Sequence, residues 1–453
     1  MLTARTSQLE HWTGGRMRGD DVLVRGMSID TRKLTPGELY LALPGQRVDG
    51  HDYLTQARSK GAAAALVNRY VDDPLPQVLV DDVQRAAGLI AAAHLHRHRA
   101  LVIAITGSNG KTTVKNLVAS ILSQRAPTLA TVGNYNNELG VPLTLAKLGA
   151  EHRYVVLEMG AGKPGDIGYL CQIAQPNVAL VNNVADAHLE YFAGRAEIAE
   201  TKGAIYAALA SDGVAVINAA DAFAPRFREL AGQRRSLEFG TPEADLAAAG
   251  NDAGYPQRFA LTGTQINLTV ELPLLGEHNR RNAAAAAAVA IAAGMNAAEI
   301  AAGLASAQPE PGRLELRQCH GFSVVDDSYN ANPASVTAAL DAIAGLGARR
   351  WLVLGDMAEL GEEREQMHRQ VGKHAKQSGA ERLYALGPLA AVAARSFGDS
   401  SRCYDALPEL IAALARDSGD SEAVVLVKGS RSASMEKVVQ ALCQAGETAC
   451  CSG

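Results

Sequence analysis

Short runs of apolar, β-branched residues recur along the chain and alternate with stretches of helical periodicity. In the central part these runs predict four strands, at Leu101–Ile105, Tyr154–Leu157, Val178–Val181 and Val214–Ile217. Because helical stretches separate the first three runs, we expect them to form a parallel sheet. From about Arg258 to Leu275 the pattern changes to alternation, which predicts an antiparallel addition to that sheet.

The part before residue 99 predicts a small α/β domain. Its apolar runs predict strands at Leu39–Leu43, Ala64–Val67 and Val78–Val80, followed by a helix over Val83–His94. Histidines alternate after this helix, at 94, 96 and 98, without a carboxylate or cysteine close by. We therefore interpret them as a solvated helix end rather than a metal site.

A segment rich in Pro and Gly, Gln308–Gly312, is the best candidate for a hinge before the last part of the chain. Beyond it, strands are expected at Phe322–Val325, Trp351–Leu354, Leu383–Leu386 and Ala423–Val427. Helices are expected between them, for example over Pro333–Leu346 and Glu362–Ser378. We expect an α/β protein of three domains: 1–98, a central domain over 99–311 with a mainly parallel sheet, and a Rossmann-like domain over 312–453.

Composition limits the classes of function. The 453 residues carry a formal charge of −5, which argues against a protein that coats nucleic acid. The longest apolar run, Ala283–Met295, is shorter than the roughly 20 residues that a bilayer requires. We interpret it as a buried alanine-rich helix capped by Asn282. The N-terminus lacks the apolar core of a signal peptide, so a cytoplasmic protein without membrane insertion is expected.

Six cysteines occur without any Cys-x-x-Cys pair or zinc-like spacing. The simplest expectation is a reduced protein.

The first central strand leads into Thr106-Gly-Ser-Asn-Gly-Lys-Thr-Thr113, which has the order that a nucleoside triphosphate needs. Glycines permit close backbone approach to phosphate, and the turn and helix N-terminus supply N–H donors. Lys111 can reach the outer phosphates, and Thr112 can bind magnesium. The general pattern has four residues between its glycines, whereas here only Ser108 and Asn109 separate Gly107 from Gly110. The alternative is a glycine turn beside a surface lysine.

Other polar residues stand at strand ends or beside the hinge. Glu158 ends a strand and is well placed to hold magnesium, although such a residue can also be merely solvated. Asp326 and Asp327 end a later strand and could hold a ribose, an ammonium group or a metal, or could cap a helix. Arg313 follows the hinge, so that domain closure could bring it to a phosphate. Spacing alone selects neither His188 nor Lys202.

These residues together resemble the Mur ligase family, the ATP-dependent enzymes that extend the peptide of the peptidoglycan precursor. The shortened phosphate loop matches that family's own variant. Further matching segments are Asn134–Pro142, Glu158–Ala161, His188–Glu190, Gly276–Asn279 and Pro311–Arg313. Within the family, Asp326–Pro333, Leu354–Gly361 and Val427–Arg431 resemble the branch that adds D-alanyl-D-alanine. Ser28–Arg32 and Gly45–His51 resemble its UDP-binding domain, so the resemblance covers nearly the whole chain.

The resemblance implies a monomeric ligase that uses ATP and two Mg²⁺ ions to join D-alanyl-D-alanine to UDP-N-acetylmuramoyl-tripeptide through an acyl phosphate. It implies catalytic roles for Lys111, Glu158, His188, Lys202 and Arg313. It implies that magnesium is held by Thr112, Glu158, His188 and a carbamylated Lys202. The nucleotide would contact Gly107, Ser108, Asn109, Gly110, Lys111, Thr112, Thr113, Asn279, Arg313 and Asp327. The other substrates would contact Ser28, Thr31, Arg32, Asp49, Asn137, Asn330 and Asp356.

Two other hypotheses compete with this one. The first hypothesis is also an ATP-dependent ligase, but with the substrate of another Mur ligase or of a folate-polyglutamate ligase. The second is a nucleotide switch or binding module with the same phosphate loop but no ligase activity. A guanine-binding switch would normally carry an Asn-Lys-x-Asp motif, and this sequence has none.

Overall fold

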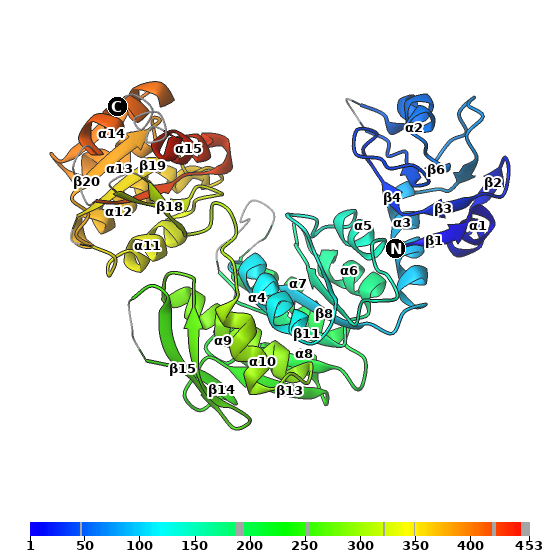
Figure 1. Ribbon diagram of the computed structural model, residues 1–453, viewed down its shortest axis with the longest axis horizontal. Coiled ribbons are helices and arrows are strands. Elements are labelled where there is room, and N and C mark those ends of the chain that lie inside the picture. Colours follow the sequence, from blue (N-terminus) through cyan, green and yellow to red (C-terminus); the bar gives the residue numbers. More distant parts are fainter. Residues whose placement is uncertain are drawn as a thin grey trace, which may run out of the picture. The chain divides into compact units, whose positions relative to one another are not determined.

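The computed structural model describes residues 1–45, 48–185, 192, 194–250, 254–319, 322–347, 349–418 and 423–444 (Figure 1). It is an α/β protein, as expected. Its contacts divide the chain into two compact units. The first comprises Met1–Ala247, Gly263–Gln265 and Ala284–Gly303, and the second comprises Ala248–Thr262, Ile266–Ala283 and Leu304–Gly453. Within the described ranges, no helix is both long and apolar enough to cross a bilayer.

The N-terminal sheet has five strands, in the order β2-β7-β6-β5-β4. They are Arg16–Arg18, Gln77–Leu79, Ala64–Val67, Leu39–Leu41 and Met27–Ser28. All pairs are parallel except the one that joins β2 to β7. Alternate strand residues face α1 (Thr6–Thr13) and α3 (Val83–Leu95) on one side and α2 (Leu54–Ser59) on the other. The strands and the helix predicted here are confirmed. The expectation of a solvated helix end is wrong for His94, which is buried and binds the Leu148 carbonyl through Nε2 at 2.9 Å. A separate antiparallel ribbon joins β1 (Thr3–Arg5) to β3 (Leu23–Arg25).

The central sheet has nine strands, in the order β16-β15-β14-β13-β12-β11-β8-β10-β9. In that order they are Asn267–Leu272, Gln257–Gly263, Leu246–Ala249, Arg235–Phe239, Val214–Asn218, Val178–Val181, Leu101–Thr106, Tyr154–Glu158 and Thr128–Ala130. The pairs from β9 through β14 are parallel, and β15 pairs with β16 in antiparallel register. Both expectations for this region are therefore confirmed.

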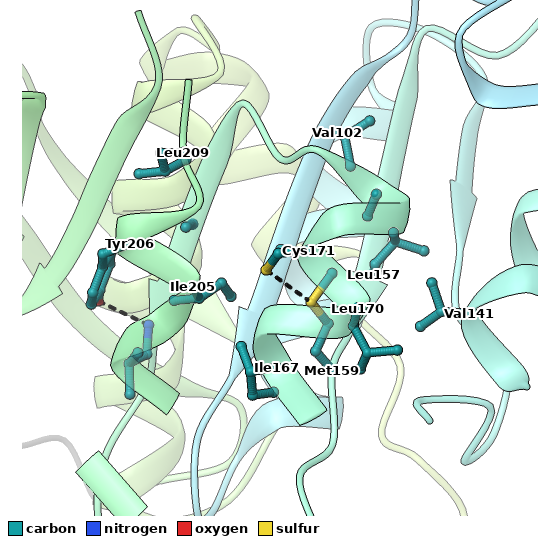
Figure 2. Packing of buried hydrophobic residues seen from close by; sticks show 14 of the residues in the cluster. Val102, Val141, Leu157, Met159, Ile167, Leu170, Cys171, Ile205, Tyr206 and Leu209 are labelled. Carbon is teal, nitrogen blue, oxygen red and sulfur yellow. Dashed lines mark hydrogen bonds between the residues drawn. The ribbon is translucent and has the colours of Figure 1, made fainter. Parts of the chain in front are cut away.

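One face of the parallel strands packs against α6 (Asp166–Ala174), α7 (Arg195–Ala207) and α8 (Ala224–Ala231). Figure 2 shows this core, in which the Cys171 sulfur lies 3.8 Å from that of Met159. The Tyr206 hydroxyl accepts a hydrogen bond from the Val181 N–H at 2.9 Å and donates one to the Val216 carbonyl at 2.7 Å. Tyr206 thus fixes α7 to two neighbouring strands. Helix α4 (Lys111–Ser123) packs against β8, β9 and β10.

The alanine-rich segment forms α9 (Glu277–Ala292), followed by α10 (Ala297–Ala305). The prediction that Asn282 caps this helix is wrong, because α9 begins at Glu277. Gly276, with a φ of +90°, precedes the helix. The first helical turns are polar and gave no apolar signal. Asn282 is instead a buried residue inside the helix, and its side-chain amide donates to Asn279 Oδ1 at 2.9 Å.

The C-terminal sheet has six strands, in the order β17-β18-β22-β19-β20-β21. They are Glu315–Cys319, Phe322–Asp327, Val424–Lys428, Arg350–Gly355, Arg382–Leu386 and Ser401–Tyr404. All pairs are parallel except β17 with β18. One core contains α11 (Pro333–Ala342), α12 (Arg364–Gln377) and α13 (Ala390–Phe397), and the other contains α14 (Leu407–Ser418) and α15 (Glu436–Gln444). Helices on both faces make this a doubly wound fold, as predicted.

A disulfide joins Cys319, at the end of β17, to Cys443 in α15. The expectation of a fully reduced protein is therefore wrong for this pair. The two residues are 124 positions apart, and packing of α15 against β17 brings them together. Spacing along the sequence could not reveal that proximity.

Candidate functional site

The phosphate loop connects β8 to α4 and depends on its two glycines. Gly107 has a φ of +154° and Gly110 a φ of +77°. A Cβ atom at Gly107 would lie 3.1 Å from Cβ of Asn182, so a larger residue would crowd the neighbouring strand end. Gly110 caps α4, whose first turn leaves backbone N–H groups without partners inside the helix. Lys111, Thr112 and Thr113 form this turn.

The loop is anchored to the segment that follows β11. The N–H of Ser108 donates to the Asn183 carbonyl at 2.9 Å, and the N–H of Asn109 donates to Asn183 Oδ1 at 2.8 Å. The Ser108 hydroxyl donates to the Ala185 carbonyl at 3.0 Å. The ammonium of Lys111 donates to the Gly107 carbonyl at 2.8 Å, so this cation lies directly over the loop.

Thr112 and Glu158 lie together at the carboxyl end of the sheet, and both are buried. The Thr112 hydroxyl donates to one Glu158 oxygen at 2.9 Å, and the Asn136 amide donates to the other at 2.8 Å. This group offers the hard oxygen donors that Mg²⁺ prefers, beside a loop suited to phosphate. Asn136 was missed from the sequence, although it lies in a segment that matches the family.

Asn137, the neighbour that the sequence selected, has a different local role. Its side-chain oxygen accepts hydrogen bonds from the N–H groups of Leu139 and Gly140, at 3.3 and 2.9 Å. It thereby fixes the start of α5 (Gly140–Leu145). A contact between Asn137 and substrate stays a prediction.

Lys202 is a buried lysine on α7, with 5% of its surface exposed. Across the described ranges, no hydrogen bond or opposite charge accompanies its ammonium group. Burial, together with the positive charge of Lys111, lowers the pKa of Lys202 to about 7. Lys111 and Lys202 are thus two neighbouring cationic groups, and an anion bound beside Lys202 would stabilise its charged form. His188, predicted beside them, lies outside the described residues.

Thr106, the last residue of β8, is also completely buried. Its hydroxyl oxygen has no hydrogen-bond partner in the parts of the chain that the structure describes. Residues 102 and 104 of the same strand face the core that contains α7. Because side chains alternate along a strand, Thr106 belongs to that same side of the sheet. A polar group of a ligand bound on that side of the sheet would give this hydroxyl a partner.

In the second unit, Asp327 and Lys428 form a buried ion pair. The Lys428 ammonium lies 2.5 Å from Asp327 Oδ2 and donates to the Asn330 carbonyl at 2.9 Å. The other Asp327 oxygen accepts the N–H of Leu314, just after the predicted hinge, at 3.2 Å. Lys428 thus orders the turn after β18, and Asp327 connects that turn to the hinge segment. Spacing gave no indication of this pairing.

Arg313 and Tyr329 lie together in this unit. The Arg313 guanidinium lies 4.2 Å from the centre of the Tyr329 ring, and the Tyr329 N–H donates to the Gly312 carbonyl at 3.0 Å. Asp326, which the sequence also indicated, binds Ser328 through the N–H and hydroxyl groups of that residue. Asp326 is therefore a local turn-forming residue, and Asp327 is the one joined to Lys428.

Asn279 points to the protein interior, where its amide donates to the Leu275 carbonyl at 2.8 Å. The preceding residue, His278, lines a cavity of about 340 Å³ beside α11. Burial and the charges of Lys428 and Arg281 lower the pKa of His278 to about 4. His278 therefore borders this cavity, whereas Asn279 is not among its lining residues, and contact of Asn279 with adenine stays a prediction.

Asp356 follows β19 and organises two neighbouring loops. Its carboxylate accepts the N–H of Ala390 at 2.7 Å, and its carbonyl accepts the Ser430 hydroxyl at 2.6 Å. The next N–H, of Met357, donates to Nε2 of the fully buried His368 at 3.1 Å. Asp356 thus contacts the loop after β22. This loop is part of the segment Val427–Arg431, which matches the family.

The substrate residues predicted in the N-terminal sheet region are mostly engaged locally. The Thr31 hydroxyl donates to Gln56 at 2.8 Å, and the Ser28 hydroxyl donates to the Asp30 carbonyl at 3.2 Å. Arg32 is exposed and makes two hydrogen bonds to the Asp30 carboxylate, at 2.9 and 2.8 Å. Its guanidinium is therefore accessible to a ligand in solution.

Asp49 lies beside a histidine that the sequence did not select. Its carboxylate binds Nδ1 of the buried His51 at 2.7 Å and Arg69 at 2.8 Å. The backbone N–H of His51, together with Arg69, lowers the pKa of Asp49 below its usual value. The other ring nitrogen accepts the N–H of Asn68 at 3.2 Å, so Asp49 and His51 hold the loop against β6.

Three domain families match the chain: "Mur ligase family, catalytic domain" over residues 23–100, "Mur ligase middle domain" over 105–290, and "Mur ligase, glutamate ligase domain" over 312–431. Among curated relatives, the UDP-N-acetylmuramoyl-tripeptide–D-alanyl-D-alanine ligase of Escherichia coli (strain K12) is 41% identical, covering 98% of this chain and 100% of its own. The Bacillus subtilis (strain 168) enzyme of the same name is 32% identical, with coverage of 93% and 94%.

Solved structures of MurF enzymes are also similar to this chain. MurF from Acinetobacter baumannii is 35% identical, with a TM-score of 0.91 over 98% of this chain and 99% of its own. MurF ligase from Thermotoga maritima, solved in complex with ADP, is 28% identical, with a TM-score of 0.82 over 94% and 98%. From these matches and from its fold, the chain belongs to the Mur ligase family.

Proposed function

We propose that the chain is an ATP-dependent ligase that joins D-alanyl-D-alanine to UDP-N-acetylmuramoyl-tripeptide. One observation supports this most strongly: the E. coli enzyme of that name is 41% identical across 98% of the chain. The phosphate loop, with Lys111 over it and Thr112 bonded to Glu158, fits the use of ATP.

In the reaction we propose, the terminal carboxylate of the tripeptide attacks the γ-phosphorus of ATP and displaces ADP. The resulting acyl phosphate is attacked by the amine of D-alanyl-D-alanine, which loses a proton as inorganic phosphate leaves and the amide forms. The first step brings two anions together. Lys111 offsets that repulsion and stabilises the charge that develops on the transferred phosphoryl group.

Two magnesium ions complete this proposal. Thr112 and Glu158 would hold one of them, and Glu158, His188 and a carbamylated Lys202 would hold or organise the other. When bound, magnesium neutralises phosphate charge. Carbamylation requires an unprotonated amine, and a lysine with a pKa of about 7 supplies it near neutral pH. Among the described residues, the buried Lys202 ammonium and the buried Thr106 hydroxyl have no hydrogen-bond partner, which supports an additional anionic group here.

Residues of both units would supply the remaining contacts. Arg313, Asp327 and Asn279 would bind the nucleotide, and Asn330 and Asp356 would face the dipeptide. Ser28, Thr31, Arg32, Asp49 and Asn137 would contact the UDP-muramoyl substrate. We place the functional domains at 1–98, 99–311 and 312–453, in a monomeric cytoplasmic enzyme. Water must be excluded while the acyl phosphate waits for the amine, and closure of hinged domains would achieve this.

The test is ATP-dependent phosphate release with the diaminopimelate- and lysine-containing UDP-muramoyl-tripeptides, each with and without D-alanyl-D-alanine. We expect release that requires both substrates and a product heavier by one dipeptide. Glutamate in place of the dipeptide tests the other ligase hypothesis. Hydrolysis that no acceptor changes would instead indicate a nucleotide switch.

A further inference from the structure

Lys115 is a lysine inside the protein, on α4 one turn after Lys111. It is 2% exposed, and its ammonium donates to the Thr131 carbonyl at 2.7 Å. Desolvation of an ammonium group costs several kcal/mol, and an unbranched apolar side chain would fill the same volume without that cost. Packing alone therefore does not explain a lysine at this position.

Thr131 connects this lysine to the candidate metal ligands. It directly follows β9 and is likewise 2% exposed. Its N–H donates to the Val156 carbonyl at 3.0 Å, which continues the pairing of β9 with β10. Its hydroxyl accepts the N–H of Glu158 at 3.0 Å. Thr131 therefore holds the backbone of Glu158 on one side and is held by Lys115 on the other.

The contacts close into a ring. Thr112 and Lys115 are three residues apart on α4, so they lie on neighbouring positions of one helical face. Lys115 binds Thr131, Thr131 binds Glu158, and Glu158 accepts the Thr112 hydroxyl at 2.9 Å. Glu158 is thus held through its carboxylate by Thr112 and through its backbone N–H by Thr131, and both contacts set the position of the carboxylate relative to that hydroxyl.

We propose that Lys115 is a positioning residue of the nucleotide–magnesium site, which fixes the Glu158 carboxylate opposite the Thr112 hydroxyl through Thr131. This rests on the proposed function, because it takes Thr112 and Glu158 as magnesium ligands. Magnesium tolerates little departure from octahedral geometry at about 2.0–2.1 Å, so a small displacement of one ligand weakens binding. Substitution of residues that orient metal ligands typically lowers metal affinity or activity about 10- to 100-fold.

The test compares Lys115→Met with Lys147→Met, a matched substitution of an exposed lysine in the same unit. Binding of Mn²⁺–ADP is measured by calorimetry, and phosphate release is measured across a series of Mg²⁺ concentrations. For Lys115→Met we expect binding of Mn²⁺–ADP about tenfold weaker, a higher Mg²⁺ requirement and an unchanged KM for D-alanyl-D-alanine. Lys147→Met should behave as the unmodified protein. A folded Lys115→Met protein with unchanged metal affinity overturns the proposal.

Thr131→Val keeps the lysine and removes only the hydroxyl that holds Glu158, so it provides a second test if Lys115→Met does not fold. We expect the same weakening, and less than additive effects in the double variant, because both residues act through one ring. Full additivity would contradict the ring. If the unmodified protein shows no magnesium-dependent phosphate release, the proposed function fails. If it is active and both variants bind metal normally, only the role of Lys115 fails.

Discussion

The ammonium of Lys428 lies 2.5 Å from a carboxylate oxygen of Asp327, and both side chains are buried. The other oxygen of Asp327 holds the N–H of Leu314, and the same ammonium holds the carbonyl of Asn330. A single ion pair therefore joins the end of β22, the end of β18 and the segment after the hinge.

Lys428→Met should destabilise the second unit strongly. It leaves the Asp327 carboxylate buried without its partner, which typically costs about 3–5 kcal/mol. Urea unfolding followed through Trp351 fluorescence, in a Trp12→Phe background, measures this unit because the chain has two tryptophans. Lys437→Met replaces an exposed lysine of α15 and should change the free energy of unfolding by less than about 0.5 kcal/mol. An equal effect of both variants would show that the pair adds nothing.

Lys111→Ala should lower turnover by about a hundredfold to a thousandfold, because it removes the cation that lies over the phosphate loop. The measurement is the steady-state rate of phosphate release, with a thermal melt of the same preparation. We expect little change in melting temperature. Near-normal kinetics would contradict the assignment of the loop.

Lys202 should make stability depend on pH. Its pKa is about 7 in the folded protein, against 10.5 when unfolded, so folding favours the neutral amine. Its ammonium form therefore destabilises the fold fully below about pH 7, and this penalty disappears as pH rises toward 10.5. In carbon dioxide-free buffer, Lys202→Met should be more stable than the unmodified protein at pH 7, and the difference should shrink at pH 9 to 10. A difference that is constant with pH would show that the lysine is solvated.

The same residue permits a chemical test. If Lys202 is carbamylated, Lys202→Ala should lose activity, and added short carboxylates such as formate or acetate should restore part of it. Full activity of Lys202→Ala without any additive would make it an ordinary lysine.

Tyr206→Phe should reduce the stability of the first unit. It removes the two buried hydrogen bonds that the hydroxyl makes to Val181 and Val216, each of which typically contributes about 0.5–1.5 kcal/mol. Trp12 fluorescence during urea unfolding, in a Trp351→Phe background, reports this unit. Tyr70→Phe removes a hydroxyl that bonds the Arg16 carbonyl at an exposed site and should change little. If both variants lower the free energy of unfolding equally, the Tyr206 hydrogen bonds do not stabilise the first unit more than an exposed hydroxyl does.

The fold was predictable where the sequence has strong local patterns. The buried parallel strands are continuous apolar runs, so β8, β10, β11 and β22 were identified. The edge strands β9 and β21 were not, because each is short and at most partly buried. Helix α9 was placed too late because its first turn is polar. Periodicity of apolar residues reports apolar burial, and these segments bury few apolar side chains.

The candidate site was predictable only in part, for a related reason. Gly107 to Thr113 are contiguous, and their order carries the chemistry. The partner of Lys115 is 16 residues away and that of Lys428 is 101 residues away. Such contacts arise when strands assemble, and neither lysine has a sequence neighbour that indicates its partner. The resemblance supplied a role for Lys202 that its spacing did not indicate, and it selected the nucleotide among the ligands that the residues left open for Asp327.

The bonds from Ser108 and Asn109 to Asn183 have a consequence for how nucleotide is recognised. They hold the phosphate loop in shape through protein contacts alone, so the loop is preorganised. The entropic cost of ordering the loop then falls on folding of the protein and not on binding of ATP. Affinity at this loop should therefore be sensitive to Asn183, a residue that need not touch the ligand.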